Sequence, residues 1–249
     1  MRYLVISDIH ANLQALLAVL AHAPSVDEVW CLGDLVGYGP NPNECIERVR
    51  ELPRLFCLAG NHDWAALGQL DLSHFNVEAR LANTWTQSVL SEEAREYLQG
   101  LPVRAEHEGV TLVHASPREP VWEYLLDTSM ARANFDYFST PLCLVGHSHL
   151  PLAFEWDERR RRCEFAPELF ETSARGEIVL SLEGRRLILN PGSVGQPRDG
   201  DPRAAYAILD TDRLAWEVRR VPYPVEITQE RMRAQGLPRR LIERLAHGR

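Results

Sequence analysis

The sequence predicts an α/β protein in which two β-sheets form a sandwich flanked by helices. Short apolar runs that end at Gly, Asp or Asn alternate with segments of helical periodicity over the first 150 residues. Beyond residue 150 the pattern changes to β-hairpins, which favours a second sheet packed on the first. With 249 residues and 45% hydrophobic content, the chain can bury the core of one large domain.

The first half of the chain is expected to contain parallel strands joined by helices. Residues 13–23 and 43–52 have helical periodicity and separate the first three apolar runs, which implies parallel strands with right-handed crossovers. Residues 76–98 predict two further helices, the second with Ser91 as its N-cap. The runs expected to form strands are YLVIS, EVWCLGD, LFCLAGN, VTLVH and PLCLVGH.

The second half is expected to supply the second sheet. Its strand candidates are LAFEWD, EIVLSLEGRRLILN with a hairpin turn at Glu183-Gly184, AAYAILD and LAWEVRRV. The tail predicts two arginine-rich helices broken at residues 236–238. The expected organisation is a single domain over residues 1–249, with site loops at 8–149, the second sheet at about 150–223 and C-terminal helices at about 225–247.

Composition narrows the setting in which the protein works. The five cysteines lie mostly inside apolar runs, which favours reduced core residues over disulfides or a zinc site and agrees with a cytoplasmic location. The N-terminus has no charged segment followed by an apolar segment and a cleavage site, and no 18 apolar residues follow each other, so we expect neither export nor a membrane span. The net charge of −8 argues against a broad nucleic-acid surface.

Five strand ends carry residue types that bind metal ions. In open parallel sheets, ligands bind beyond the carboxyl ends of the strands, so all five segments are expected to meet at one edge. Alone, each has a plainer explanation, because a single histidine is usually a hydrogen-bonded core residue and Gly-Asp is usually a turn. Their coincidence favours a metal site. The segments are SDIH (Asp8, His10), GD (Asp34), GNHD (Asn61, His62, Asp63), VH (His114) and GHSH (His147, His149).

In this order the segments resemble the D-x-H, G-D, G-N-H-[DE], H and G-H-x-H blocks of the calcineurin-like metallophosphoesterase superfamily. The resemblance covers about the first 150 residues. It continues more loosely through GDLVGYGPNPNECIE and LNPGSVGQPRDGDPRAAYAI, which look like a branch of small bacterial and archaeal phosphodiesterases. It implies the metallo-dependent phosphatase fold and a hydrolase acting on a small phosphodiester or nucleotide-like substrate.

The resemblance also implies a role for each site residue. His62 would lie outside the ligand set as general acid or phosphate contact, and Asp63 would orient it. Asp34 would bridge two metal ions. The remaining ligands implied are Asp8, His10 and His149 for one ion, and Asn61, His114 and His147 for the other.

The chemistry of these residue types fits such a centre. Imidazole nitrogens with carboxylate and amide oxygens, and no thiolate, suit two divalent ions such as Mn, Fe, Co, Ni or Zn without selecting among them. Two ions roughly 3.5–4 Å apart lower the pKa of a bridging water and clamp phosphoryl oxygens for in-line attack by the resulting hydroxide. The sequence departs from many relatives at Ala11 and Ala115, which stand where those have glycine. We expect a methyl group to be tolerated at these positions only if φ is negative.

Two alternative functions stay open at this point. A nuclease is one, since residues 159–162 are four consecutive arginines, although a charged hairpin tip explains them as well. The other is a non-catalytic metal-binding interaction module on the same fold. Against it stands the presence of every expected ligand together with His62. A serine/threonine phosphatase is disfavoured, because the GD segment continues as LVGYGP and lacks the arginine of GDxxDRG.

Several residues outside the motifs are candidates for substrate contacts or for partner contacts. Arg198 lies in a turn that can approach the site and touch a phosphate, and a hairpin connection is the plainer alternative. The arginines between Arg219 and Arg244 are expected on solvated helix faces or in a contact between copies of a homo-oligomer. The aromatic residues that we expect near the substrate pocket are Tyr38, Trp64, Phe75 and Tyr124.

Overall fold

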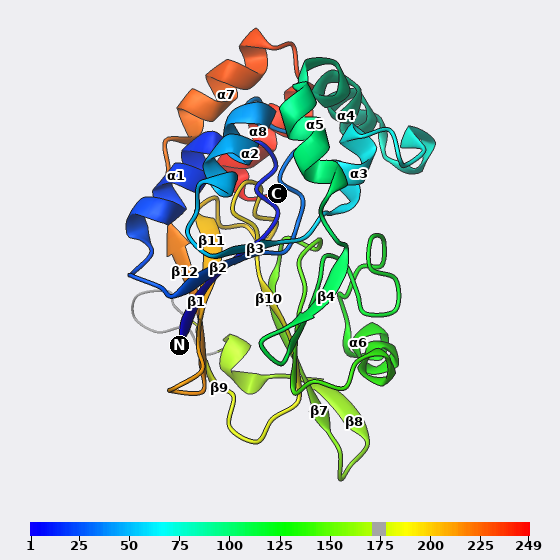
Figure 1. Ribbon diagram of the computed structural model, residues 1–249, viewed down its shortest axis with the longest axis vertical. Coiled ribbons are helices and arrows are strands. Elements are labelled where there is room, and N and C mark those ends of the chain that lie inside the picture. The colour runs from blue at the N-terminus through cyan, green and yellow to red at the C-terminus, as the bar shows by residue number, and fades with distance from the viewer. Residues whose placement is uncertain (171–177) are drawn as a thin grey trace.

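The computed structural model describes residues 1–170 and 178–249 and contains two mixed six-stranded sheets (Figure 1). Their strand orders are β3-β2-β1-β11-β12-β9 and β4-β5-β6-β10-β7-β8. The first sheet consists of β3 (Leu55–Cys57), β2 (Glu28–Cys31), β1 (Arg2–Ile6), β11 (Ala204–Asp210), β12 (Ala215–Val221) and β9 (Ile178–Ser181). The second consists of β4 (Arg104–His107), β5 (Val110–Val113), β6 (Leu142–Leu144), β10 (Leu187–Pro191), β7 (Pro151–Asp157) and β8 (Arg162–Phe165).

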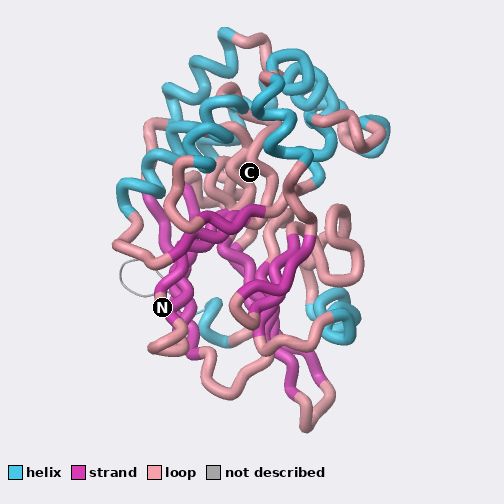
Figure 2. Tube along the Cα trace, in the orientation of Figure 1, coloured by secondary structure: helices cyan, strands magenta, loops and turns pink. Residues whose placement is uncertain are grey.

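The two sheets face each other across one apolar layer, and helices cover their outer faces (Figure 2). Strand β1 shows why: Tyr3 and Val5 point into the layer between the sheets, whereas Leu4 and Ile6 point outward to helix-covered core. This is the two-residue alternation of a strand that is buried on both faces. The fold class predicted from the sequence, an α/β sandwich flanked by helices, is confirmed.

Parallel pairing brings three site-bearing loops together. Strand β1 pairs with β2, and β2 with β3, so that Ile6, Cys31 and Cys57 are in register across the first sheet. The loops that follow these strands therefore leave the sheet side by side. In the second sheet β5 and β6 are also parallel, as the sequence predicts.

The division of strands between the sheets differs from the expectation. Residues 150–223 do not form a sheet of their own, because β7, β8 and β10 join the second sheet while β9, β11 and β12 join the first. The hairpin predicted at Glu183-Gly184 is wrong, since β9 pairs with β12 and β10 with β6 and β7. A local turn signal does not specify hydrogen-bond partners, and here the turn carries the chain from one sheet to the other.

Helices gather over the first sheet and at the end of the sandwich where the site loops emerge (Figure 1). Ser91 caps α5 as predicted, accepting from the N–H of Ala94. The short α3 and α6 and strand β4 were not expected, because pieces of a few residues carry little periodicity. The helices are α1 (Leu13–His22), α2 (Pro42–Arg50), α3 (Asn61–Ala66), α4 (Val77–Val89), α5 (Glu92–Gln99), α6 (Thr128–Asn134), α7 (Val225–Ala234) and α8 (Arg239–Arg244), with 3-10 turns at Leu72–His74, Phe135–Tyr137, Pro167–Phe170 and Leu245–His247.

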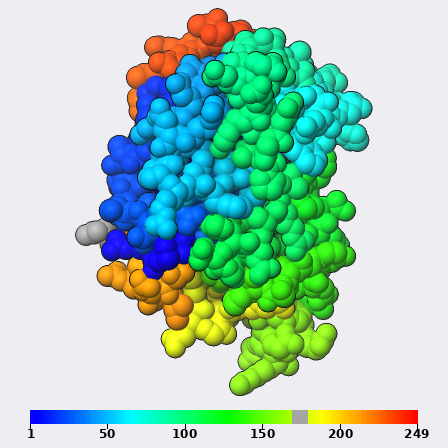
Figure 3. Space-filling model, in the orientation of Figure 1, coloured from blue at the N-terminus to red at the C-terminus, as the bar shows by residue number. Residues whose placement is uncertain are grey.

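The C-terminal helices are packed onto the body of the molecule. Helix α7 lies against α1 and α8, and Figure 3 shows this orange segment beside the blue α1 at one end of the molecule. Residues Leu241, Ile242 and Leu245 form a buried cluster with Tyr38 and with Ala82 of α4. The N–H of Gly200 donates to the main-chain oxygen of Gly248 at 2.9 Å. Within the described residues, no helix has the length and apolar character needed to cross a membrane.

Candidate metal centre

The predicted ligands converge, but from both sheets rather than from one sheet edge. Asp8, Asp34 and Asn61 follow strands of the first sheet, while His114, His147 and His149 follow strands of the second. The expectation of a single edge is therefore corrected: the site lies where the ends of two facing sheets meet. We call Asp8, His10, Asp34, Asn61, His114, His147 and His149 the ligand cluster; all seven are buried.

Tight left-handed turns direct several of these side chains. Asp8, His10, Asp34, His147 and His149 all have positive φ, between 49° and 63°. This region is costly for most L-residues, and Asp and His tolerate it better than most. Main-chain hydrogen bonds hold the turns together, as the N–H groups of Asp8 and His10 donate to the carbonyls of Gly33 and Asp34, each at 3.0 Å.

One group of ligand atoms is formed by Asp8, His10 and His149. Their candidate ligand atoms all lie within 4.8 Å of one another. The Nε2 atoms of His10 and His149 are 2.9 Å apart, and Asp8 Oδ1 lies 3.6 Å from His149 Nε2. The N–H of His147 donates to Asp8 and fixes the carboxylate.

A second group is formed by Asp34, His114 and His147, again within 4.8 Å of one another. Asn61 belongs beside it, since its Oδ1 lies 3.2 Å from His114 Nε2. The Oδ2 oxygen of Asp34 is 3.6 Å from His10 Nε2 and 3.4 Å from His114 Nε2. Asp34 Oδ2 is also buried without a hydrogen-bond partner, so this one atom faces both groups.

Main-chain carbonyls set the orientation of three imidazole rings. The Nδ1 atoms of His10, His114 and His149 lie 3.1, 2.8 and 2.6 Å from the carbonyl oxygens of Val36, Leu32 and Gln196. A carbonyl can only accept, so each Nδ1 carries the proton. With Nδ1 protonated, it is Nε2 that faces the cluster, and once unprotonated it offers its lone pair to a metal ion, as in most metal-ligating histidines.

Electrostatics agree with a site built to hold cations. Burial lowers the pKa of His10 and His149 well below the ordinary value, so both rings are neutral and two Nε2 lone pairs face each other across 2.9 Å. Burial also raises the pKa of Asp8 to about 7. Although burial opposes it, Asp34 raises the pKa of His114 to about 9. Closely packed imidazole nitrogens and carboxylates with shifted pKa values are typical of ligand sets for cations.

His62 lies beside the cluster, and its surroundings correct the expected partner. Its main-chain N–H donates to Asp34 Oδ1 at 2.8 Å, and its Nδ1 lies 3.1 Å from Asn83 Oδ1 on α4. Asp63 accepts instead from the N–H groups of Val36 and Gly60, at 3.1 and 2.9 Å. Among the described contacts, Asn83 rather than Asp63 therefore orients the ring. Burial lowers the pKa of His62 to about 4.

Sequence reasoning missed Asn83, although a signal was present. Ala79, Ala82, Asn83 and Thr86 make up the buried side of α4, and Asn83 is fully buried there. A buried amide on a helix face needs a hydrogen-bond partner, and such a residue points to a polar site beneath the helix.

The two alanines that replace glycine behave differently. Ala11 has a φ of +51°, so the expectation of negative φ is wrong at this position. Its N–H donates to Leu35 and its carbonyl accepts from Asn41, which hold the strained turn in place. Ala115 is not among the residues with positive φ, and there the expectation is confirmed.

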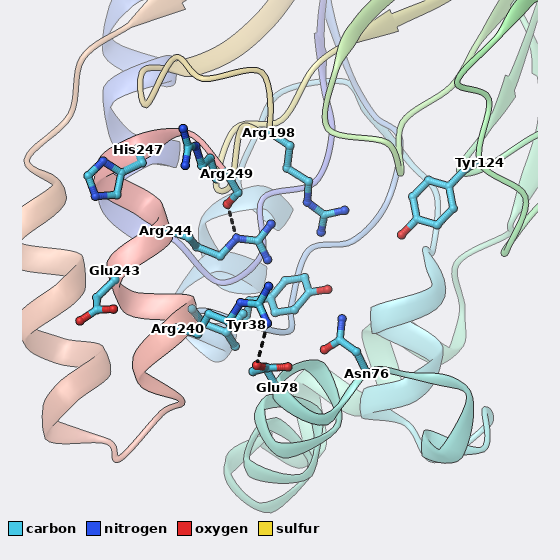
Figure 4. A pocket seen from close by; sticks show the side chains of 11 residues that line it. Tyr38, Asn76, Glu78, Tyr124, Arg198, Arg240, Glu243, Arg244, His247 and Arg249 are labelled. Carbon is cyan, nitrogen blue, oxygen red and sulfur yellow. Dashed lines mark hydrogen bonds and ion pairs between the residues drawn. The ribbon is translucent and has the colours of Figure 1, made fainter.

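Aromatic side chains surround the cluster. The ring of Tyr38 lies 4.7 Å from that of His10 and 4.3 Å from that of His62, and Tyr124 stacks on His147 at 4.0 Å. Phe75 lies 5.1 Å from the ring of His62. Beyond Tyr38 and Tyr124 opens a cavity of about 930 Å³ that Arg198 also lines (Figure 4).

Comparison with known proteins agrees with this architecture. The sequence profile of the calcineurin-like phosphoesterase superfamily domain matches residues 1–214. The crystal structure of a metallophosphoesterase from Sphaerobacter thermophilus is 47% identical, with a TM-score of 0.88 over 100% of this chain and 99% of that one. An uncharacterized protein from Methanocaldococcus jannaschii is 39% identical over 98% of this chain and 97% of its own length.

The chain is also more distantly similar to proteins whose names state a reaction. A symmetrical bis(5'-nucleosyl)-tetraphosphatase from Glaesserella parasuis is 29% identical over 51% of this chain and 49% of its own length. The chain belongs to the calcineurin-like phosphoesterase superfamily. The family predicted from the sequence and the class of enzyme, a metallophosphoesterase, are thereby confirmed.

Proposed function

We propose that the chain is a dinuclear metal-dependent hydrolase of small phosphodiesters or nucleotide-like phosphate esters. The observation that carries the proposal is the position of Asp34 Oδ2. This buried oxygen has no hydrogen-bond partner and lies 3.6 Å from His10 Nε2 in one ligand group and 3.4 Å from His114 Nε2 in the other. A carboxylate oxygen in this position could be shared by two adjacent divalent ions.

The donor set supports two divalent ions. Asp8, His10 and His149 would hold one, Asn61, His114 and His147 the other, with Asp34 common to both. The nitrogen and oxygen donors fit Mn, Fe, Co, Ni or Zn. When bound, such ions supply Lewis-acid polarisation of the phosphoryl group and lower the pKa of water at the site.

In this proposal His62 protonates the leaving oxygen of the ester. The Nδ1–H of its ring donates to Asn83, which leaves Nε2 free to carry the proton that is transferred. An anionic phosphate beside the ring favours the protonated imidazolium and opposes the effect of burial on its pKa. Asp63 holds the loop before α3 in place by accepting a hydrogen bond from the N–H of Gly60. Glycine is needed at that position, because a Cβ there would lie 2.1 Å from Asp34 Oδ1.

The substrate class is supported by the relatives and by charge. The tetraphosphatase relative acts on a dinucleoside polyphosphate by its name, which favours a nucleotide-like ester here. A nuclease is less favoured, since the net charge is −8 and residues 159–162 lie at the exposed β7–β8 hairpin tip. A non-catalytic module is also less favoured, because every expected ligand is present and buried.

The setting of the enzyme follows from two further features. Residues of both sheets share one buried apolar layer, which supports a single domain over residues 1–249. All five cysteines are buried free thiols, which supports work in the reducing cytoplasm. A homo-oligomer stays a prediction.

The test is hydrolysis of a chromogenic phosphodiester and of the matching monoester. Chelator-stripped protein would receive Mn, Fe, Co, Ni, Zn or Mg separately, and elemental analysis would count the bound ions. We expect metal-dependent turnover and about two ions per chain. A protein that binds two ions yet turns over neither ester would favour the interaction module. Cleavage of a plain oligonucleotide in preference to both esters would favour the nuclease.

A further inference from the structure

Four arginines among the described residues line the cavity next to the ligand cluster. It has a volume of about 930 Å³ and borders the cluster through Tyr38 and Tyr124. Figure 4 shows the guanidinium groups of Arg198 and Arg244 pointing into the same space beside Tyr38. We call this the arginine pocket; its lining residues used below are Tyr38, Tyr124, Arg198, Arg240, Arg244 and Arg249.

Positive charge in the arginine pocket is only partly compensated. The Nε of Arg198 is buried without a hydrogen-bond partner, and an Nη of Arg198 donates to the neutral amide of Gln196 at 3.2 Å. Arg244 donates to the main-chain oxygen of Arg249. Burial, followed by the proximity of Arg198, lowers the pKa of Arg244 to about 10, as expected for like charges facing each other.

The two glutamates that line the cavity do not neutralise this pair. Glu78 lies 3.4 Å from Arg240, and Glu243 pairs with Arg239 on the exposed side of α8 at 2.5 Å. Among the described ion pairs, neither Arg198 nor Arg244 has a side-chain carboxylate partner, and Arg244 is held by the main-chain oxygen of Arg249.

The arginine pocket is also held in a fixed place. Helix α8 is anchored by Leu241 and Leu245, which pack into the cluster that contains Tyr38. The main-chain N–H of Arg198 lies 3.4 Å from the carbonyl of His149, one of the candidate ligands. The backbone positions from which these arginines extend are therefore fixed relative to the ligand cluster.

We propose that the arginine pocket binds a second phosphate of the substrate, so that the substrate is a small ester carrying at least one phosphate besides the one that is cleaved. The proposal rests on the proposed function for the first phosphate. Guanidinium groups bind phosphate oxygens through paired, charge-assisted hydrogen bonds. Arg240, Arg244 and Arg249 lie beyond residues 1–214, the part of the chain that the superfamily profile matches.

A small oligophosphate fits this pocket better than a nucleic-acid strand does. A strand needs an extended basic track, and here Glu78 and Glu243 interrupt the arginines along the lining of the cavity. The chain as a whole carries a net charge of −8, which disfavours a long polyanion more than a compact one.

The experiment is calorimetric binding of inorganic tripolyphosphate and of orthophosphate to the metal-loaded full chain at a fixed free metal concentration. The variants are R244A and R240A, with R239A as the matched control. Arg239 lies on the same helix, carries the same charge, is 89% exposed and pairs with Glu243, but it does not line the cavity. Metal chelation by tripolyphosphate affects all variants equally, so differences between them report the pocket.

We expect tripolyphosphate to bind at least about tenfold more tightly than orthophosphate to the wild-type chain. R244A should lose roughly tenfold of that affinity and R240A a few-fold, while R239A stays within twofold of wild type. Circular dichroism checks that R244A is folded; should it not be, R240A carries the test, because Arg240 is 83% exposed.

Three results would overturn the proposal: equal affinity for both anions, equal losses in R244A and R239A, or tighter and Arg244-dependent binding of a single-stranded oligonucleotide. Turnover of the single-phosphate chromogenic diester tests the proposed function separately. Absence of that turnover together with Arg244-dependent tripolyphosphate binding would reject the hydrolase and leave the anion site supported.

Discussion

The ligand cluster and the arginine pocket lie side by side, but they are built in opposite ways. Every residue of the cluster is buried, and main-chain groups fix its turns and rings at distances of 2.6–3.1 Å. The arginine pocket instead uses long side chains, of which Arg240 is 83% exposed. The difference shows that rigid main-chain contacts position the ligand atoms where they must converge. Flexible, charged side chains are used where an anion needs only electrostatic attraction.

Removing the atom that joins the two ligand groups should have the largest effect. In D34N, the shared carboxylate becomes a neutral amide of the same shape. We expect kcat/KM to fall by about three orders of magnitude or more, because binding of both ions weakens and each supplies several kcal/mol of transition-state stabilisation. Steady-state kinetics and elemental analysis measure the two consequences. Activity near wild type with two bound ions would mean that Asp34 is not shared.

A second substitution, at His62, distinguishes the role of a proton donor from the role of a metal ligand. In H62Q, we expect kcat to fall by roughly 10²–10⁴ while the content of bound metal stays at its wild-type value, since His62 is proposed to act on the leaving group. The monoester of a good leaving group should be affected least, as it needs no protonation. Loss of metal in H62Q would instead place His62 among the ligands, as its closeness to His10 and Asp34 allows.

Substitution of Asn83 tests whether a residue that contacts His62, but not the ligand cluster, also affects catalysis. N83A removes the hydrogen bond to His62 Nδ1, and we expect kcat to fall by roughly tenfold, the value of one buried hydrogen bond, with little change in KM. The pH profile of kcat should shift as well, because the amide oxygen favours the protonated ring. T84A, at an exposed neighbouring position of α4, is the control. A drop in thermal stability with no change in the pH profile would reduce Asn83 to a structural role.

The sequence predicted that the residues of the ligand cluster come together, but it did not predict the arginine pocket. Ligand residues stand directly after apolar strands, so the order of the strands alone brings Asp8, Asp34 and Asn61 together. The arginines of α8 were expected to be solvated or to contact another copy. Only the packing of Leu241 and Leu245 against Tyr38 turns one face of the helix toward the site. That is a long-range contact, and helical periodicity within the tail does not specify it.

Strand partners were the other limit of prediction. Each of β9 and β10 is evident from its apolar residues, and the turn between them is evident from Glu183-Gly184. The sheet that each strand joins depends on which sheet edges remain unpaired after the other strands have formed their hydrogen bonds. Leu180 and Leu187 both end in the layer between the sheets, so the apolar pattern alone gives the same answer for a hairpin and for a crossing.

The smallest expected effect concerns backbone strain inside the cluster. At Ala11, with φ +51°, substitution by glycine should relieve backbone strain by about as much free energy as the loss of the buried methyl group costs. At Ala115 the same substitution relieves no such strain. We therefore expect A115G to destabilise the chain by about 1–2 kcal/mol more than A11G in chemical denaturation. Equal losses in the two variants would show that the turn at Ala11 stores no strain.

The placement of α7 and α8 has a consequence for how related enzymes can diverge. Helix α8 contributes Arg240 and Arg244 to the wall of the cavity, Arg249 follows it, and neither helix supplies a candidate ligand. Both helices lie outside residues 1–214, the part of the chain that the superfamily profile matches. Substitutions there can change which molecules are accepted without disturbing the hydrolytic centre. Exchange of this tail between relatives of the same fold is therefore a route by which selection can assign one reaction to different metabolites.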